Sequence, residues 1–159
     1  MFSKEIQSAL NEQINSEFLA WYTYLAMSSY FKSVNLNGFA RWMGKQAQRE
    51  MAHAMKIYEF LHEREAPVGF KSISEPPADW RSPLDAISEA YRREQESSGR
   101  INDLVDLAMK NRAHATNTFL QWFVNEQVEE EAGLRAIVKK LELVGDDRYG
   151  LFLIDRDMR

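Results

Sequence analysis

The sequence predicts an all-α protein, a four-helix bundle with a long crossover between helices two and three and a short fifth C-terminal helix. Four stretches of about 28 residues each keep the three-and-four spacing of apolar side chains that is typical of bundle helices. All four proline residues lie between positions 67 and 83, so they interrupt the helical pattern in one place only. The chain has 159 residues, enough for one full-sized core, and we expect a single domain over residues 1–159.

The four long helices are expected at 4–32, 37–64, 83–110 and 114–143. Short turns, "VNLNG" and "KNRAH", join the first helix to the second and the third helix to the fourth. Ser82 as N-cap and Pro83 at the first helical position favour the start of the third helix. Gly145 is expected to end the fourth helix, and a short fifth helix should follow at 147–156.

The connection at 66–81, "APVGFKSISEPPADWR", has no helical period. Fully extended it could reach about 50 Å. A helix of about 28 residues is about 42 Å long, so the connection can run the whole length of the bundle. We therefore expect the second and third helices to be parallel, and the two pairs joined by short turns to be antiparallel.

Each predicted helix carries polar residues at interior positions near its midpoint, although its interior positions are otherwise mainly apolar. On the third helix the predicted interior positions are Leu84, Ile87, Tyr91, Glu94, Ser98, Ile101, Val105 and Ala108. Mid-height is the one level that does not depend on helix direction, so the central polar residues should meet in one layer. These residues are Glu17, Glu50, His53, Glu94, Gln127 and Glu130.

Four inward carboxylates are costly to bury unless cations balance them. No lysine or arginine lies at the central interior positions, and two divalent cations would balance four carboxylates. Carboxylate oxygens with one imidazole suit iron, manganese or zinc, whereas the absence of cysteine argues against a closed structural zinc site. Taken singly, each glutamate could be solvated and the histidine a hydrogen-bonded core group. Agreement among four helices favours a dimetal carboxylate site.

With these residues, the chain resembles the non-haem ferritins of bacteria and archaea. The resemblance covers essentially all 159 residues and includes the loop motif "EPPADW" and the segment "FLQWFVNEQVEEE". It implies an iron-storage protein with ferroxidase activity, which oxidises Fe(II) with dioxygen or peroxide. It also implies a homo-oligomeric hollow shell of about 24 subunits that stores a ferric mineral.

The resemblance also implies the role of individual residues, with two irons bound in each subunit. Residues matching Glu17, Glu50 and His53 hold the first iron. Those matching Glu50, Glu94 and Glu130 hold the second, and Glu50 bridges the pair. Gln127 matches a residue close to the irons, and Tyr24 matches a tyrosine whose hydroxyl hydrogen-bonds a ligand.

Bacterial ferritins often have a third iron site beside the pair, on residues matching Glu126, Glu129 and Glu130 and one more glutamate. In this sequence the position of that last glutamate holds Arg49. A guanidinium is always cationic and has no acceptor atom, so it cannot ligate a metal. We hypothesise that Arg49 pairs with the neighbouring carboxylates and leaves the third site weak or absent.

Three alternatives remain at this stage. A bacterioferritin would bind haem between subunits through a methionine at the position of Met51, but the Glu-x-x-His that such proteins carry on the last ligand helix reads here as Gln127-Val-Glu-Glu130. Haem is therefore not expected. A di-iron, peroxide-reducing oxidoreductase would use the same bundle without a shell. A purely structural bundle is disfavoured by the central carboxylates.

Composition excludes other classes. The net charge of −4 gives no electrostatic reason to expect a nucleic-acid partner. The sequence has no apolar run long enough to span a bilayer and no signal-peptide core near its start, so we expect no membrane partner and a cytoplasmic location. His62 and His114 lie near predicted helix ends and are expected at the surface. Trp122 neighbours the polar layer, where it could pack or donate an electron.

Overall fold

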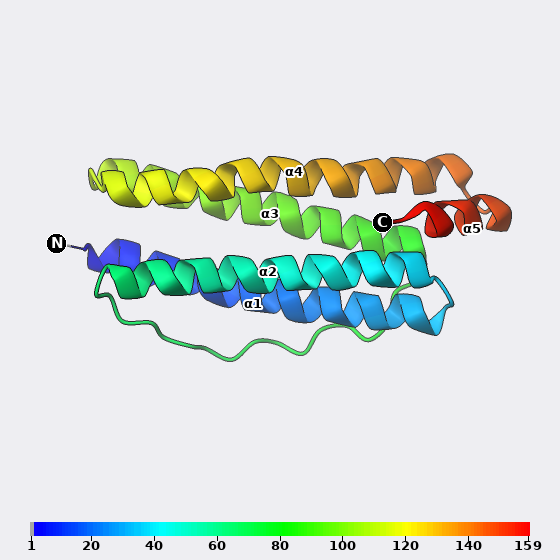
Figure 1. Cartoon of the computed structure of the whole chain (residues 1–159), viewed down its shortest axis with the longest axis horizontal. Coiled ribbons are helices and arrows are strands. Elements are labelled where there is room, and N and C mark those ends of the chain that lie inside the picture. The colour runs from blue at the N-terminus through cyan, green and yellow to red at the C-terminus, as the bar shows by residue number, and fades with distance from the viewer. Residues whose placement is uncertain (1) are drawn as a thin grey trace.

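The computed structural model describes residues 2–159 and contains five α-helices (Figure 1). Their bounds are α1 Lys4–Ser33, α2 Asn37–Glu63, α3 Pro83–Lys110, α4 His114–Val144 and α5 Arg148–Asp157. Every boundary lies within one residue of the sequence prediction, and no strand occurs among residues 2–159. The predicted all-α bundle with a fifth helix is confirmed.

The four long helices form two antiparallel pairs, α1 with α2 and α3 with α4, and α1 packs beside α3. The segment between α2 and α3 runs along the outside of the α1–α2 pair from one end of the bundle to the other, which makes α2 and α3 parallel (Figure 1). Asn11 holds this segment against α1, because its side chain donates to the Pro67 carbonyl at 3.1 Å and accepts from the Gly69 N–H at 2.7 Å. The predicted crossover is therefore confirmed.

Local chemistry explains where the helices begin and end. Ser82 caps α3 by accepting a hydrogen bond from the Asp85 N–H at 3.1 Å, as predicted. Asn35, Glu65 and Arg112 take positive φ angles of 62°, 54° and 54° just beyond α1, α2 and α3. Gly145 ends α4 with a φ of 53°, a value that costs glycine little.

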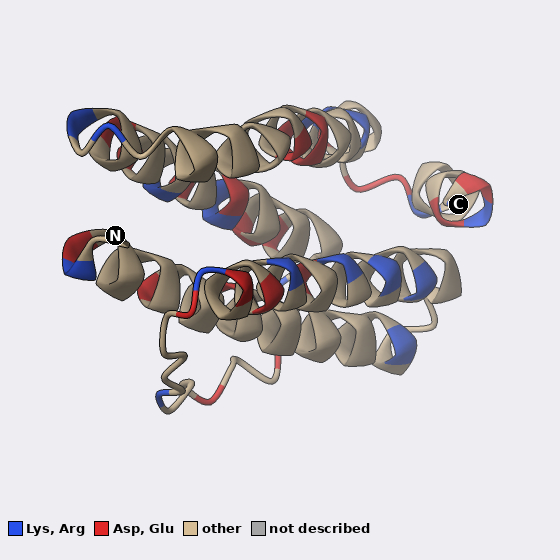
Figure 2. Ribbon diagram, turned by 60° about the vertical axis from the view of Figure 1, so that its left-hand side comes forward, with Lys and Arg blue, Asp and Glu red and all other residues tan. Residues whose placement is uncertain are grey.

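The core consists of two apolar clusters with a polar layer between them. One cluster lies toward α5 and includes Phe31, Phe39 and Leu134. The other lies toward the start of α1 and includes Leu10 and Phe123. The polar layer therefore lies between the two apolar clusters, at the predicted middle level of the bundle. Acidic and basic residues are interspersed along the helices, as Figure 2 shows.

The predicted interior face of α3 is partly wrong. Tyr91, Ser98 and Val105 are only half-buried, and the buried positions are instead Ala90, Ser97 and Leu104. Both sets include Ile87, Glu94, Ile101 and Ala108. Between these shared residues, each buried position lies one residue before the predicted one. Helix α3 packs against both α1 and α4, and the positions between these two neighbours, Ala90 and Ser97, are buried, whereas Tyr91 lies to one side and is half-buried. A single three-and-four pattern does not describe a helix with two neighbours.

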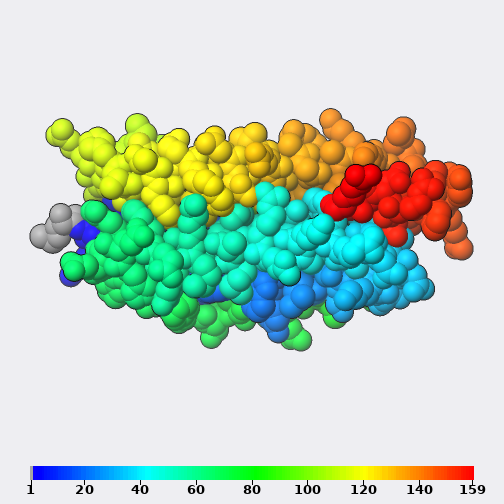
Figure 3. All heavy atoms as spheres, viewed as in Figure 1, coloured from blue at the N-terminus to red at the C-terminus, as the bar shows by residue number. Residues whose placement is uncertain are grey.

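Helix α5 folds back onto the end of the bundle and contacts both α2 and α4 (Figures 1 and 3). Asp155 on α5 accepts a hydrogen bond from the Phe39 N–H at 2.9 Å. No side chain of the preceding residue caps α2, so Asp155 satisfies one of the unpaired N–H groups at its start. Gly38 makes this contact possible, because a Cβ atom there would lie 1.8 Å from the Asp155 carbonyl oxygen.

Changing Gly38 to alanine is expected to displace α5 from the start of α2, since no methyl group fits at that distance. Hydrogen exchange should show faster exchange of the Phe39 amide and of the α5 amides than in the wild type. The matched control is Gly99→Ala in α3, where a Cβ meets no atom of residues 2–159 within 4 Å. It should stabilise its helix by about 0.5–1 kcal/mol. Unchanged exchange of α5 in Gly38→Ala would contradict this docking.

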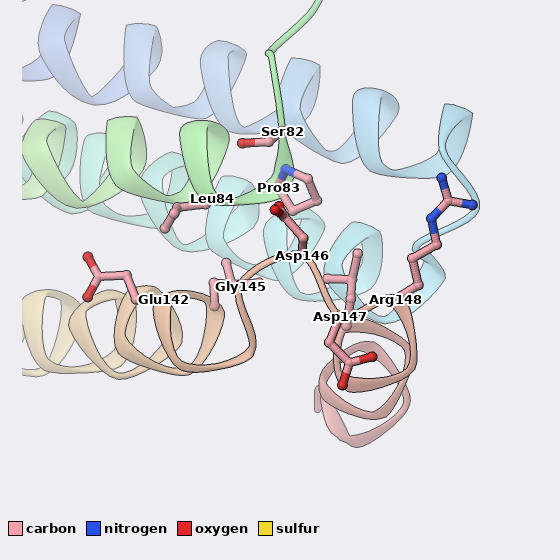
Figure 4. A pocket seen from close by; sticks show the side chains of 10 residues that line it. Ser82, Pro83, Leu84, Glu142, Gly145, Asp146, Asp147 and Arg148 are labelled. Atoms are coloured by element: carbon pink, nitrogen blue, oxygen red, sulfur yellow. The ribbon is translucent and has the colours of Figure 1, made fainter.

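Two further features describe the surface. A pocket of about 450 Å³ lies where α3 begins and α4 ends, lined by residues that include Ser82, Glu142 and Arg148 (Figure 4). It contains none of the polar-layer residues, and we assign it no ligand. Among residues 2–159, no helix combines the length and the apolar character that crossing a membrane requires.

Candidate metal centre

The structure brings all six predicted polar residues together at mid-height. Helix α1 contributes one of them, α2 two, α3 one and α4 two. Each is at most 4% exposed: Glu17, Glu50, His53, Glu94, Gln127 and Glu130. Burial of this many ionisable groups in one layer has a large desolvation cost, so the layer needs partners that compensate for the lost water.

The first compact group of ligand-type atoms comes from Glu17, Glu50 and His53, and these atoms lie within 4.8 Å of one another. His53 Nδ1 is 3.7 Å from Glu17 Oε2 and 3.7 Å from Glu50 Oε2. Two carboxylate oxygens and one imidazole nitrogen converge there from two helices. This is the residue set that the ferritin resemblance implies for the first iron.

The second compact group comes from His53, Glu126 and Glu130. His53 Nε2 is 3.5 Å from Glu126 Oε1, so the two nitrogens of the ring face different carboxylates. The ferritin resemblance implies a role for Glu126 only in a weak third site. Its position four residues before Glu130 puts both on one face of α4, which is the signal that could have brought it nearer to the centre.

Glu94 is held by hydrogen bonds, and its oxygens are in neither compact group. The Tyr24 hydroxyl donates to Glu94 Oε1 at 2.6 Å, and Gln127 Nε2 donates to Glu94 Oε2 at 3.0 Å. Tyr24 and Gln127 therefore both orient Glu94. A ligand role for Glu94 stays a prediction.

Gln13 is a residue of the site that the sequence analysis missed. It is 2% exposed, and its Nε2 donates to Glu17 Oε1 at 2.9 Å. Gln13 lies one helical turn before Glu17, and this spacing on one face of α1 was a signal for it. By fixing one oxygen of Glu17, Gln13 leaves the other oxygen directed toward His53.

Several buried ligand-type atoms of the layer have no hydrogen-bond partner within the part of the chain that the structure describes. They are Glu50 Oε1 and both ring nitrogens of His53. Buried polar atoms are nearly always paired, and each unpaired one calls for a reason. Bound cations would satisfy these atoms together, so the residues present fit a metal-binding function.

The shifted pKa values show that the buried side chains of this layer do not balance one another's charges. Burial raises the pKa of Glu50 well above its usual range, and Glu17 and Glu94 raise it further. Burial also raises the pKa of Glu94, and it takes that of Glu130 to about 7. Burial alone would lower the pKa of His53, but the Glu17 carboxylate outweighs it and raises that pKa. The layer therefore retains protons at neutral pH that cations can replace.

Arg49 lies beside the second group, as the third-site hypothesis expects. Its Nη2 donates to Glu126 Oε1, and its Nε is 3.0 Å from Glu130 Oε1. Burial would raise the pKa of Glu126, but the guanidinium of Arg49 holds it below its usual value. Glu129 is exposed and belongs to neither compact group, although its charge acts on Arg49.

The remaining residues singled out in the sequence lie at the edge of the site or away from it. Met51 is half-buried, and both His62 and His114 are exposed. The Trp122 ring is 39% exposed and lies 5.4 Å from the His53 ring, centroid to centroid. Lys56 Nζ sits 4.0 Å from the centroid of the same indole, a cation–π contact. Trp122 therefore packs against the His53 ring at a steep angle and borders the centre.

A four-helix bundle with a long crossover and a central layer of carboxylates and histidine defines the class of dimetal-carboxylate bundle proteins. A family model for the ferritin-like domain matches residues 7–144. The chain therefore belongs to the ferritin-like family.

Individual relatives agree with this membership. A bacterial non-heme ferritin of Staphylococcus aureus is 36% identical over 158 residues, which cover 99% of this chain and 95% of that protein. One from Staphylococcus haemolyticus is 35% identical with the same coverage. A crystal structure of an open pore ferritin from the hyperthermophilic archaeon Archaeoglobus fulgidus matches with a TM-score of 0.98 and 45% identity, over 99% of this chain and 98% of that one.

Proposed function

We propose that this protein is a non-haem ferritin, which oxidises Fe(II) and stores the product as a ferric mineral. The observation that carries the proposal is the convergence of buried ligand-type atoms from Glu17, Glu50, His53 and Glu130 inside a ferritin-like bundle, with atoms of Glu50 and His53 left unpaired. Relatives named bacterial non-heme ferritins match along almost the whole chain, which supports the same function. Location in the cytoplasm is part of the proposal and rests on the family resemblance.

Iron is the substrate of the centre. In the proposed arrangement Glu17, Glu50 and His53 bind one Fe(II), and Glu50, Glu94 and Glu130 bind the second, with Glu50 shared between them. Two Fe(II) ions lose two electrons. These electrons, with two protons, reduce one dioxygen to hydrogen peroxide or one hydrogen peroxide to two waters. Holding two metal ions together lets both electrons reach one oxidant molecule.

The residues of the chain prepare the site for this chemistry. Glu50 and Glu130 hold protons because burial raises their pKa values, so binding of Fe(II) releases protons into the site. Burial, with Glu94 and Glu50, raises the pKa of Tyr24 well above its usual range. Tyr24 therefore stays protonated and keeps donating to Glu94. Its role in the proposal is to position that carboxylate.

The proposal includes assembly into a closed homo-oligomeric shell. Large apolar side chains are exposed at the α5 end of the bundle: Leu143 is 86% exposed, Tyr149 68% and Phe152 57%. Exposed apolar groups on a small domain favour contact with further copies. Helix α5 presents two of the three, which gives it a place in the subunit contacts.

Light scattering and iron loading of the same purified sample test the proposal. We expect a mass of about 440 kDa, against 18.5 kDa for one chain, from a shell of about 24 subunits. Added Fe(II) in air should be oxidised rapidly and should stay in solution with the protein. A stable monomer at micromolar concentration would exclude storage in a shell. Oxidation without retained iron would instead favour a di-iron oxidoreductase.

A further inference from the structure

A narrow passage leads from the surface between α1 and α3 to the carboxylates of the metal centre. Its volume is about 120 Å³. At its outer end lie the exposed residues Glu96 and Arg100. At its inner end lie Tyr24, Glu50 and Glu94, each 1% exposed. The lining thus extends from exposed side chains to the glutamate that the proposed function shares between both irons.

The size of the passage selects small molecules. Its walls include Ser16 and Ala20 on α1 and Ser97 on α3, all with short side chains. One water takes about 30 Å³ of liquid volume, so the passage accommodates only a few molecules of that size in line. Dioxygen and hydrogen peroxide are within this limit. A divalent cation that keeps its hydration shell is considerably larger.

The charge of the passage also favours a small neutral molecule over a cation. Arg93 lines it, and its buried Nε has no hydrogen-bond partner within residues 2–159. Arg100 adds a second guanidinium at the outer end. The acidic groups nearby are already paired, since Glu96 lies 2.8 Å from Arg92 and Glu89 lies 3.1 Å from Arg93. Apart from Glu50 and Glu94 at its inner end, the charged residues that line the passage are Arg93, Arg100 and Glu96. Two guanidiniums against one carboxylate ahead of the inner end repel Fe(II) and have little effect on a neutral oxidant.

We propose that this passage admits the oxidant, dioxygen or hydrogen peroxide, and that Fe(II) reaches the centre by a different route. The inference rests on the proposed ferroxidase function, because an oxidant needs access only if the centre oxidises iron. Separate routes let the oxidant arrive while iron occupies its ligands. Ser97 and Ala20 then act as the residues that keep the oxidant route open.

Narrowing the passage tests the inference. Ser97→Leu fills it from α3, and Ala20→Leu fills it from α1. The initial rate of Fe(II) oxidation should fall at least about fivefold in both, measured by stopped flow with dioxygen and separately with hydrogen peroxide. Anaerobic titration should give the same number of bound Fe(II) per subunit as the wild type, with the same binding rate. The matched control is Ser88→Leu, on α3 but outside the lining of the passage.

The outcomes separate the two proposals. If the wild type neither binds nor oxidises Fe(II), the proposed function is wrong. If the wild type does both, and the narrowed variants oxidise iron as fast as Ser88→Leu, the passage does not carry the oxidant. Slower anaerobic binding of Fe(II) in the narrowed variants would assign the passage to iron and overturn the inference. Slowing with one oxidant alone would support it for that oxidant.

Discussion

Replacing Glu50 by alanine is expected to lower the initial rate of Fe(II) oxidation by about 100-fold or more. Loss of a residue that only supports a metal ligand typically costs 10–100-fold in metal affinity or activity, and a shared ligand should cost at least as much. Glu50 is the one carboxylate that the proposed arrangement gives to both irons. Its loss leaves His53 and Glu17 for one ion and Glu94 and Glu130 for the other.

The same change should leave the bundle intact. Glu50 is 1% exposed, and burial together with Glu17 and Glu94 raises its pKa. Burying this carboxyl group therefore destabilises the folded protein when no metal is bound. Removing such a group relieves crowding among the remaining carboxylates. We therefore expect circular dichroism and thermal unfolding in the absence of added metal to show an equal or greater melting temperature than the wild type.

The control for Glu50→Ala is Glu59→Ala. Glu59 is an exposed glutamate on α2, the helix that carries Glu50, so its removal takes away one negative charge without touching the buried layer. Its oxidation rate should equal that of the wild type. A wild-type initial rate in Glu50→Ala would refute the shared-ligand assignment, whereas equal losses in both variants would point to general electrostatics.

The features that the sequence predicts well are those that depend on helix periodicity and on the middle of each helix. Glu17, Glu50, Glu94 and Glu130 meet because mid-height is the same level for parallel and antiparallel helices. The crossover follows from the length of the proline-containing segment compared with the length of a helix. None of these inferences needs knowledge of which helix lies beside which.

The features that the sequence does not predict depend on contacts between particular helices. Ala90 and Ser97 are buried because α1 lies against them, and a single interior pattern for α3 cannot anticipate a second neighbour. The capping of α2 by Asp155 joins residues 116 positions apart, and it depends on the absence of a side chain at Gly38. The passage between α1 and α3 arises from the same packing of helices, so no sequence motif predicts it.

Changing Arg49 to glutamate is expected to raise the number of tightly bound Fe(II) ions per subunit from two to three. In the wild type the guanidinium donates to Glu126 through Nη2, and its Nε lies 3.0 Å from Glu130 Oε1. It therefore supplies positive charge to the two carboxylates that a further cation beside the pair would need. Glutamate at this position removes that charge and adds a third carboxylate to the same cluster.

Arg49→Gln separates the two effects, because it removes the cation without adding a ligand carboxylate. It should still bind two irons tightly, since an uncharged amide is a weak substitute for a carboxylate in a site for Fe(II). Both variants should be less stable than the wild type without added metal, because Glu126 and Glu130 lose their partner. The glutamate variant should lose more, because it adds like charge. Arg49 is 40% exposed, so solvent moderates both losses.

Anaerobic Fe(II) titration of the wild type, Arg49→Gln and Arg49→Glu, with binding monitored through tryptophan fluorescence, distinguishes the possibilities. Trp122 lies 5.4 Å from the His53 ring, near enough to respond when a cation binds beside that histidine. The expected series is two, two and three tight irons. Three tight irons in the wild type would mean that Arg49 swings away from Glu126 and Glu130 when iron arrives. Two in all three proteins would mean that the geometry of α2 and α4, and not the charge of Arg49, limits the centre to a pair.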